Sequence, residues 1–394
     1  MTATIIITLC VLILLAYVFD LTSSKTKIPS VIFLLISGWV FKQLTVDLSI
    51  HVPNLSSALP VLGTIGLILI VLEGSLELEF DKTKSTLIRK SFFTALIPMV
   101  TLALGFAYLL QFFGEPNFKY NLVNIIPLCV ISSAIAIPSV RLLSSHNREF
   151  VIYESSLSDI LGVLLFNFIA LNDSFGFPAF GHFILELLII VAVSFIATAG
   201  LSFLLSKIDH HIKFVPIILL IILIYAISKL YHLPGLVIIL IFGLFLGNVD
   251  KLRKLKWIEK LKPEEFSREI HKFKDLTIEG AFLIRALFFL LFGYLIDTSE
   301  LLNADTFIWA TCFTLGIFAL RAIQLAIFRL PFAPLLFIAP RGLITILLFL
   351  SIEPDERLPL VNRSLVIQVI VLTALVMMVG LMTSARTRRS NPPM

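Results

Sequence analysis

The sequence predicts an all-α membrane protein that crosses the bilayer with about thirteen helices, because of its composition and the spacing of its apolar segments. Of the 394 residues, 58% are hydrophobic and 14% are charged, whereas soluble globular chains carry about a quarter charged residues. The mean hydropathy is +1.01. A helix needs about 20 apolar residues to cross a bilayer, so this chain is almost entirely membrane domain. The composition excludes a soluble enzyme.

Apolar windows separated by polar residues divide the chain, and each window is expected to form one span. The windows cover residues 3–20, 28–44, 58–76, 91–113, 122–143, 151–171, 180–206, 213–229, 233–248, 276–296, 304–329, 332–350 and 362–383.

The positions of Lys and Arg set the expected orientation. Of the 31 basic residues, five fall in loops on one side, namely Lys42, Lys119, Lys229, Arg357 and Arg363, and three lie within spans. The rest lie in loops on the other side, which the positive-inside rule assigns to the cytoplasm. We therefore expect an integral protein of the plasma (inner) membrane, with the N-terminus outside and the C-terminus in the cytoplasm.

One longer polar segment, residues 249–275, interrupts the series of spans. Its mixture of Leu, Trp257, Ile258, Phe266 and Phe273 with many Lys indicates either a helix lying on the inner leaflet or a solvated linker helix. The net charge of +5 reflects these cytoplasmic loops, so the lipid bilayer is the expected partner and nucleic acid is not. No phosphate-binding loop or metal-ligand spacing occurs, so we expect no cofactor.

Ionisable residues inside spans are costly and are therefore candidates for function. The set comprises Glu73, Glu154, Asp159, Glu186, Arg285, Arg321 and Arg341. Glu73 and Glu186 lie near span ends, where interfacial water explains them. Asp159, Arg321, Arg341 and Arg285 all lie about 12–14 Å from the cytoplasmic end of their spans, close to the middle of the hydrocarbon core. Ser133 lies at about 15 Å, near the same depth.

Two spans carry helix breakers at this depth: Ser132 to Pro138 in the fifth span and Ala339 to Gly342 in the twelfth. A broken helix within a membrane is tolerated only where it is buried or lines a cavity. The breaks fall in the middle spans of two three-span groups that enter the membrane from opposite sides. The sequence thus predicts inverted repeats whose two broken helices cross at the midplane, where an ion site is expected.

The sixth span supplies the carboxylate. Ser155, Asp159 and Gly162 share one face of the helix, and Gly162 permits close approach of a neighbour. Glu154 is turned away from Asp159 by roughly 140°, so the two acids face different partners. We expect Asp159 to face the broken fifth span and Glu154 to form a buried ion pair with Arg321. The alternative is that an arginine neutralises Asp159, which then only holds helices together.

Several segments, taken in order, resemble the monovalent cation:proton antiporter superfamily of sodium/proton exchangers. ESSLSD at 154–159 resembles the ESxLND signature of that family, and APRGLITILLFL at 339–350 resembles its RG-containing twelfth span. VLEGSLELEF at 71–80, FFLLFGYLID at 288–297 and FALRAIQ at 318–324 are similar to the third, tenth and eleventh spans.

This resemblance implies a scaffold and a moving core. The scaffold comprises residues 1–90 and 176–300, and the core comprises residues 91–175 and 301–394. It also implies a homodimer, cation and proton binding in turn at Asp159, cation coordination by Ser155 and a Glu154–Arg321 pair. Two positions depart from the family pattern: Ser132-Ser133 replaces a Thr-Asp pair, closer to the potassium-efflux branch, and Ser158 replaces Asn.

The mechanism expected from these residues is competition for one carboxylate. Burial favours the neutral form of a carboxyl group, so protons and cations compete for Asp159, and hydroxyls of Ser132, Ser133, Ser155 and Ser158 are the further candidate ligands. One such acid predicts electroneutral one-for-one exchange of a monovalent cation for H⁺. The resemblance implies that the cation is Na⁺, with K⁺ possible, and that the exchange serves pH homeostasis. A second titrating acid, Glu154 or Glu73, would make the exchange electrogenic.

The roles of the two mid-span arginines and the function of the chain each have more than one interpretation from the sequence. Pro138, Arg341 and Gly342 are expected at the helix breaks, where Arg341 either stabilises the negative helix ends or pairs with a carboxylate. Arg285 is assigned only as a second internal counter-ion. The alternative functions are a potassium/proton efflux antiporter and a non-transporting or regulatory scaffold of the same fold. An intramembrane enzyme is disfavoured because no nucleophile and base lie at one depth.

Overall fold

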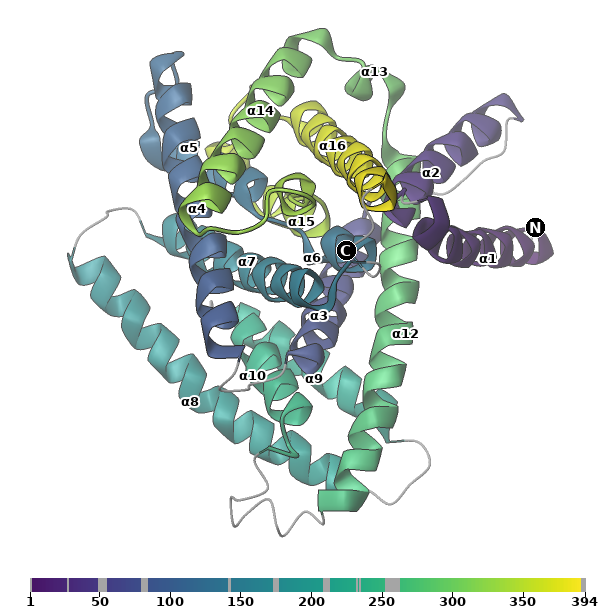
Figure 1. Ribbon diagram of the computed structural model, residues 1–394, viewed down its shortest axis with the longest axis vertical. Helices are drawn as coiled ribbons and strands as arrows, with labels where there is room; N and C mark the ends of the chain where they lie inside the picture. Colours follow the sequence, from purple (N-terminus) through teal and green to yellow (C-terminus); the bar gives the residue numbers. More distant parts are fainter. Residues whose placement is uncertain are drawn as a thin grey trace. The chain divides into compact units, whose positions relative to one another are not determined.

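The structure, a computed structural model, describes residues 2–26, 28–48, 55–78, 84–140, 143–172, 177–207, 213–231, 233, 235–251 and 263–390. Within these ranges it contains helices and no strand (Figure 1). Nine of the described helices are long and apolar enough to cross a membrane, and three shorter apolar helices add to them. With the interrupted twelfth segment, they account for the thirteen expected spans.

The spans follow the apolar windows in order. They are α1 (Thr2–Thr26), α2 (Ser30–Asp47), α3 (Ala58–Glu77), α4 (Ser85–Phe112), α5 (Phe118–Cys129) with α6 (Ser133–Ser139), α7 (Ser145–Leu171), α8 (Phe177–Lys207), α9 (Phe214–Leu230), α10 (Leu236–Gly247), α12 (Pro263–Leu295), α14 (Ala304–Ile327), η2 (Leu335–Phe337) with α15 (Leu343–Leu350), and α16 (Arg363–Ser390). Two short helices, α13 (Thr298–Leu301) and η3 (Pro354–Glu356), lie in connections.

The chain forms two compact units. The first comprises residues 1–63, 89–162 and 283–394. In it, α14 packs against α16, both contact η2, and α15 packs against α5. The second comprises residues 64–88 and 163–282, where α8 packs along α10 around Ile190, Val237 and Ile238. Asp159, Glu154, Arg321 and the residues of both helix breaks lie in the first unit, whereas Glu73 and Glu186 lie in the second. The division into scaffold and core remains a prediction.

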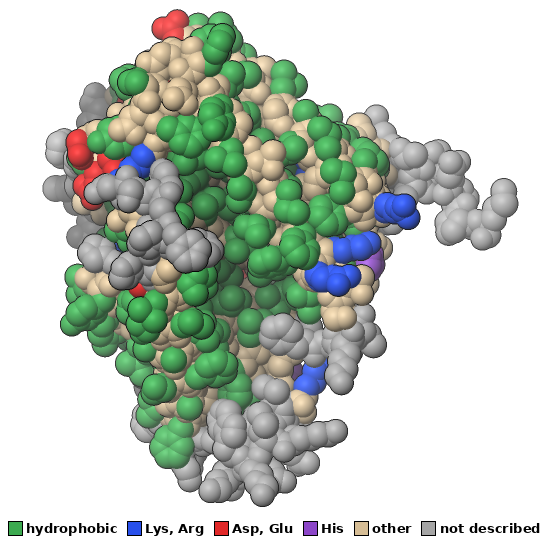
Figure 2. All heavy atoms as spheres, turned by 90° about the vertical axis from the view of Figure 1, so that its left-hand side faces the viewer, with side chains coloured by type: hydrophobic (Ala, Val, Ile, Leu, Met, Phe, Trp, Pro, Cys, Tyr) green, Lys and Arg blue, Asp and Glu red, His purple; other side chains and the backbone are tan. Residues whose placement is uncertain are grey.

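The surface is apolar, as a lipid-facing protein requires. Figure 2 shows a face covered largely by hydrophobic side chains, with few charged groups. Large side chains such as Phe112, Ile196 and Leu230 are at least three-quarters exposed. Contiguous apolar surface of this kind is rare on soluble monomers and is expected where acyl chains replace water.

The segment at 249–275 was expected to form a helix on the inner leaflet or a solvated linker helix, and at 263–275 it is helical but is not an element of its own. Residues 263–275 form the first turns of α12 and continue directly into the tenth span. Pro263 begins the helix at the position where its missing N–H costs nothing, and no proline follows within it. Phe266, Ile270 and Phe273 are buried on one face. Residues 252–262, with Trp257 and Ile258, lie outside the described ranges.

Candidate functional site

The fifth span is interrupted between Cys129 and Ser133. Val130 and Ser132 adopt extended backbone angles between α5 and α6. Pro138 was expected to mark the break, but it lies inside α6 and one residue before its end. Proline's fixed φ suits a helix, and the one backbone bond that it removes falls close to the point where α6 stops. The break therefore precedes the proline by six residues.

The twelfth span is interrupted more severely. It begins with only the 3₁₀ turn η2, continues through an irregular stretch at 338–342 and becomes helical at Leu343. Three prolines, Pro331, Pro334 and Pro340, occur within ten residues. Because each one removes a backbone donor and blocks the preceding turn, the first half of this span cannot form the α-helix that the apolar window suggested.

The two interrupted segments cross in contact with each other. The backbone N–H of Ser132 donates to the carbonyl oxygen of Pro340 at 2.9 Å. A Cβ placed on Gly342 would lie 2.9 Å from Ser132 Oγ and 2.6 Å from Ile135 Cδ1. The close approach of the two segments therefore requires glycine at 342.

Asp159 projects from α7 against this crossing and is 2% exposed. Its Oδ2 accepts hydrogen bonds from the backbone N–H of Ser133, at 3.3 Å, and from Ser133 Oγ. Its Oδ1 is buried without a hydrogen-bond partner, and so is Ser132 Oγ. No Lys, Arg or His in the described part of the chain forms an ion pair with Asp159. The site thus holds unsatisfied oxygen atoms and no fixed positive partner.

The other serines of α7 have different surroundings. Ser158 Oγ accepts a hydrogen bond from the backbone N–H of Ile131 at 2.9 Å, which supports the break itself. Ser155 Oγ donates to Val151 O within its own helix, so its hydrogen is not directed at Asp159. A serine that the sequence reasoning passed over, Ser156, has a buried hydroxyl without a partner.

Gly162 completes this face of α7. A Cβ there would lie 2.4 Å from Cγ2 of Val130, the first residue of the break. The absence of a side chain at 162 therefore lets the interrupted segment pack directly on α7.

Glu154, one turn away on the same helix, is fully paired. Arg321 Nη1 and Nη2 donate to its two oxygens at 2.5 and 2.7 Å, and Gln324 Nε2 donates to Oε1 at 3.1 Å. The carboxylate is 1% exposed. A bidentate guanidinium pair is among the strongest polar contacts in proteins, and inside a membrane it leaves no net charge.

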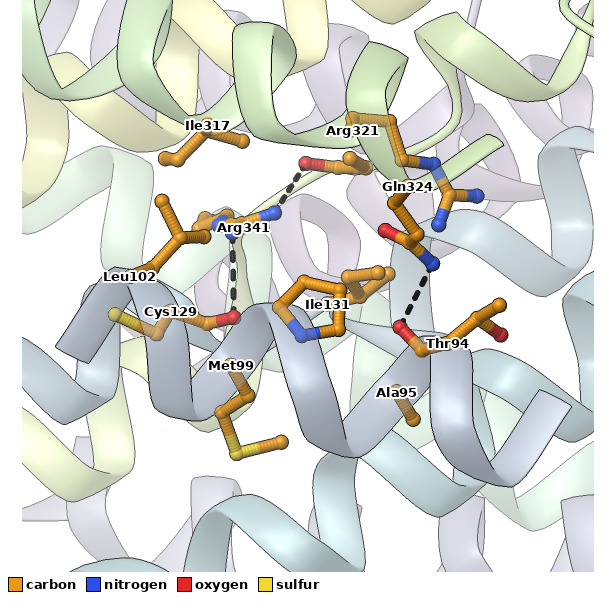
Figure 3. Close-up of a pocket in the computed structure, with 12 residues that line it drawn as sticks. Thr94, Ala95, Met99, Leu102, Cys129, Ile131, Ile317, Arg321, Gln324 and Arg341 are labelled. Atoms are coloured by element: carbon orange, nitrogen blue, oxygen red, sulfur yellow. Dashed lines mark hydrogen bonds between the residues drawn. The ribbon is translucent and has the colours of Figure 1, made fainter. Parts of the chain in front are cut away.

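Arg341 contacts backbone and not carboxylate. Its Nε, Nη1 and Nη2 donate to the carbonyl oxygens of Leu128, Ala339 and Cys129 at 2.8, 2.7 and 3.2 Å, and Figure 3 shows the bond to Cys129. Leu128 and Cys129 are the final residues of α5, where carbonyl groups lack helical partners. These contacts are those expected of an arginine that stabilises the negative end of a broken helix. Arg285 is buried on α12.

Three neutral residues that the sequence reasoning missed support the site. Gln324 links Glu154 to the carbonyl of Thr94, and Thr373 Oγ1 accepts from the backbone N–H of Arg341 at 3.1 Å. Asn124 donates to Glu356 O and accepts from Leu358 N, which ties α5 to the connection after α15. The signal that could have found them is an amide or hydroxyl side chain within an apolar window, away from the helix breaks and from ESSLSD.

The family model described as "Sodium/hydrogen exchanger, transmembrane" matches residues 10–388. The chain belongs to the sodium/hydrogen exchanger family. As a member of this family, the chain is an integral membrane protein of a transporter class. Its membership also supports cation–proton antiport with Na⁺ and H⁺ as substrates.

The fold of this family member is similar to that of solved antiporters. A structure of the sodium proton antiporter MjNhaP1 from Methanocaldococcus jannaschii at pH 8 superposes with a TM-score of 0.68 at 18% identity, covering 96% of this chain and 99% of that one. An electron-microscopy structure of the same antiporter gives a TM-score of 0.68 at 18% identity and covers both chains fully. No curated protein sequence matches. The predicted family and the predicted fold class are confirmed.

Proposed function

We propose that this chain exchanges a monovalent cation for a proton at Asp159. The observation that carries the proposal is a buried carboxylate at the crossing of two interrupted spans, with one oxygen unpartnered and no ion-pair partner among the described residues. Glu154, on the same helix, provides the contrast because its charge is already balanced.

Competition for one carboxylate couples the two ions. Deprotonated Asp159 offers hard oxygen ligands, and Ser132 Oγ lies in the adjacent break without a partner. Alkali cations prefer such ligands, and Ser133, Ser155 and Ser158 supply further hydroxyls on the same two elements. Bound proton and bound cation each neutralise the carboxylate, so either loaded form avoids the cost of an uncompensated charge in an apolar medium. The cation is Na⁺, with K⁺ as the alternative.

The stoichiometry follows from the pairing of the second acid. Because Glu154 is held by Arg321 and Gln324, it does not serve as a second exchanging group. One carboxylate then carries one cation in one direction and one proton in the other. This exchange is electroneutral, in contrast to a cycle in which two acids titrate.

The transport cycle is alternating access. The core of residues 91–175 and 301–394 exposes Asp159 in turn to the two sides by moving against the scaffold of residues 1–90 and 176–300, in a homodimer of the plasma membrane. The N-terminus lies outside and the C-terminus in the cytoplasm. The crossing of two interrupted spans at a single site supports this scheme.

Cation-driven proton flux in proteoliposomes tests the proposal. The native chain should acidify or alkalinise the lumen when a Na⁺ gradient is imposed, and a K⁺ gradient measures selectivity. Asp159→Asn keeps the shape of the side chain but removes its charge, so flux should fall to the rate of protein-free vesicles. The matched control is Asp305→Asn, at an exposed position in the first turn of α14, which should transport as the native chain does.

Two outcomes would overturn the proposal. Native flux in Asp159→Asn would remove this carboxylate from the mechanism. Absence of flux in a folded native chain, with either cation, would favour a non-transporting scaffold.

Electrical recording separates one-for-one exchange from the alternative. Electroneutral exchange moves no net charge across the membrane in a complete cycle, so a cation jump on a solid-supported membrane should give at most the brief transient of cation binding while proton flux continues. A sustained charge movement would instead require a second titrating acid. Competition is checked in the same vesicles: the apparent KM for the cation should rise by up to about tenfold per pH unit on acidification, because one proton competes with one cation for the carboxylate.

A further inference from the structure

A small cavity lies between α4, α14 and the two interrupted segments (Figure 3). Its lining includes Arg321 from α14, Arg341 and Cys129 from the breaks, and Ala95 and Met99 from α4. The space open to the centre of a water molecule is about 20 Å³, above the roughly 10–15 Å³ that one water requires. Asp159 is not part of this lining, so the cavity is separate from the proposed exchange site.

Both guanidinium groups retain unused donors. An arginine carries five N–H groups. Arg341 uses three of them on carbonyl oxygens, and Arg321 uses three on Glu154 and on Leu335 O. Two N–H groups on each residue therefore have no hydrogen-bond partner among the residues that the structure describes.

The lining carries net positive charge. Glu154 balances Arg321, but the partners of Arg341 are neutral carbonyl groups, and no Asp or Glu is among the described residues that line the cavity. The two guanidinium groups also repel each other electrostatically. Arg341 is 1% exposed, and a buried charge without an opposite charge is strongly unfavourable. The partial negative charge at the end of α5 compensates it only in part.

We propose that this cavity binds a chloride ion through the unused N–H groups of Arg341 and Arg321. A single chloride balances the unpaired charge and is somewhat larger than a water molecule, which agrees with a space above the requirement of one water, whereas phosphate and organic carboxylates are too large for it. The remaining lining is mostly apolar, as with Met99 and Ile317, which suits a weakly hydrated halide better than a strongly hydrated anion.

Chloride binding also has a consequence for transport, and that consequence rests on the proposed function. Cys129 and Ile131 line the cavity, while Ser133, two residues further along the same break, holds Asp159. Loading Asp159 with a proton or a cation removes negative charge from this region, and a bound anion restores it. Anion binding and loading of Asp159 should therefore favour each other, reciprocally.

Thermal unfolding of the purified full chain in detergent tests binding without reference to transport. At equal ionic strength, Tm should be higher in chloride than in gluconate, should saturate with chloride concentration and should respond to bromide in the same way. Ala95→Val adds two methyl groups to the cavity wall and should abolish the difference between the salts. Ala326→Val adds the same groups at an exposed position on α14 and should preserve it.

Equal Tm in both salts would mean that the cavity holds only water and would overturn the proposal, as would a chloride effect that survives in Ala95→Val. Should Ala95→Val fail to fold, crystals of the native chain grown in bromide give a second readout. An anomalous peak between the two guanidinium groups supports the proposal, and its absence rejects it.

Transport provides the test of coupling. In proteoliposomes, the apparent KM for the cation should be several-fold lower in chloride than in gluconate, with kcat unchanged. A halide effect on Tm without any change in KM would reject the coupling but retain the site. A chain that transports nothing would reject the proposed function, and the Tm measurement would still decide on the site.

Discussion

Asp159 and Glu154 lie five residues apart on α7 and are both almost completely buried, yet their surroundings differ in one respect. Glu154 receives two hydrogen bonds from a guanidinium group and one from an amide. Asp159 receives its hydrogen bonds from Ser133, and its second oxygen has no partner. Burial alone therefore does not distinguish the carboxylate that we propose to exchange ions from the one that holds helices together. The distinction lies in whether a permanent positive charge already occupies the place that a cation would take.

The largest expected effect comes from unpairing the structural acid. Glu154→Gln leaves Arg321 buried without an opposite charge, and loss of one partner of a buried pair costs about 3–5 kcal/mol. The free energy of unfolding in mixed micelles should fall by that amount. In contrast, Asp159→Asn should leave stability unchanged or raise it, because it removes an unpaired buried charge.

A double variant provides the control for this contrast. Glu154→Gln combined with Arg321→Met removes both charges, and replacement of a whole buried pair by uncharged groups is often neutral. Most of the lost stability should return. Equal destabilisation by Glu154→Gln and Asp159→Asn would contradict the distinction between the two acids.

A smaller effect is expected where the breaks cross beside Asp159. Gly342→Ala would place a methyl group within 3 Å of Ser132 Oγ and Ile135 Cδ1, and overpacking of this kind costs about 1–3 kcal/mol. Thermal unfolding should occur at lower temperature, and proton flux should drop because the Ser132 hydroxyl is displaced. Gly105→Ala is the matched control, since a Cβ at 105 meets no atom within 4 Å. Native flux and stability in Gly342→Ala would show that the crossing does not set the geometry of the site.

The smallest effect concerns the hydroxyl of Ser133, which donates a hydrogen bond to Asp159. Ser133→Ala removes one hydrogen bond and one oxygen ligand but keeps the backbone N–H contact, and a hydrogen bond contributes about 0.5–1.5 kcal/mol net. The apparent KM for the cation should rise by up to about tenfold, which flux measurements over a range of cation concentrations would detect. Ser133→Thr retains the hydroxyl and should stay close to native. An unchanged KM in Ser133→Ala would exclude this hydroxyl from the cation site.

Charge and helical periodicity in the sequence anticipated part of this arrangement. An unpaired charge in a membrane is so unfavourable that Glu154 had to face a basic residue, and the structure places it on Arg321. The angle between Glu154 and Asp159 followed from helix geometry, and the glycine at 162 indicated close packing of a neighbour, which is Val130.

Other features depend on contacts that no single-sequence pattern encodes. The break in the fifth span lies at 130–132 because Ser158 and Pro340 satisfy its backbone groups, and neither partner is near in sequence. The first half of the twelfth span is a single 3₁₀ turn, although its window is as apolar as the others, because its prolines outweigh its hydropathy. The cost of burying charge points only to ionisable residues. It therefore gives no indication of the neutral residues Gln324, Asn124 and Thr373.

The backbone bond from Ser132 to Pro340 limits which motions the protein can make. If the two interrupted segments separated, the N–H group of Ser132 and the C=O group of Pro340 would lose their hydrogen bond in a region without water to replace it. In the proposed transport cycle, both segments should therefore move together, with Asp159 and any ion bound to it. A gating motion that separates the two interrupted segments is therefore disfavoured. A motion in which the two segments shift together relative to the neighbouring helices costs less.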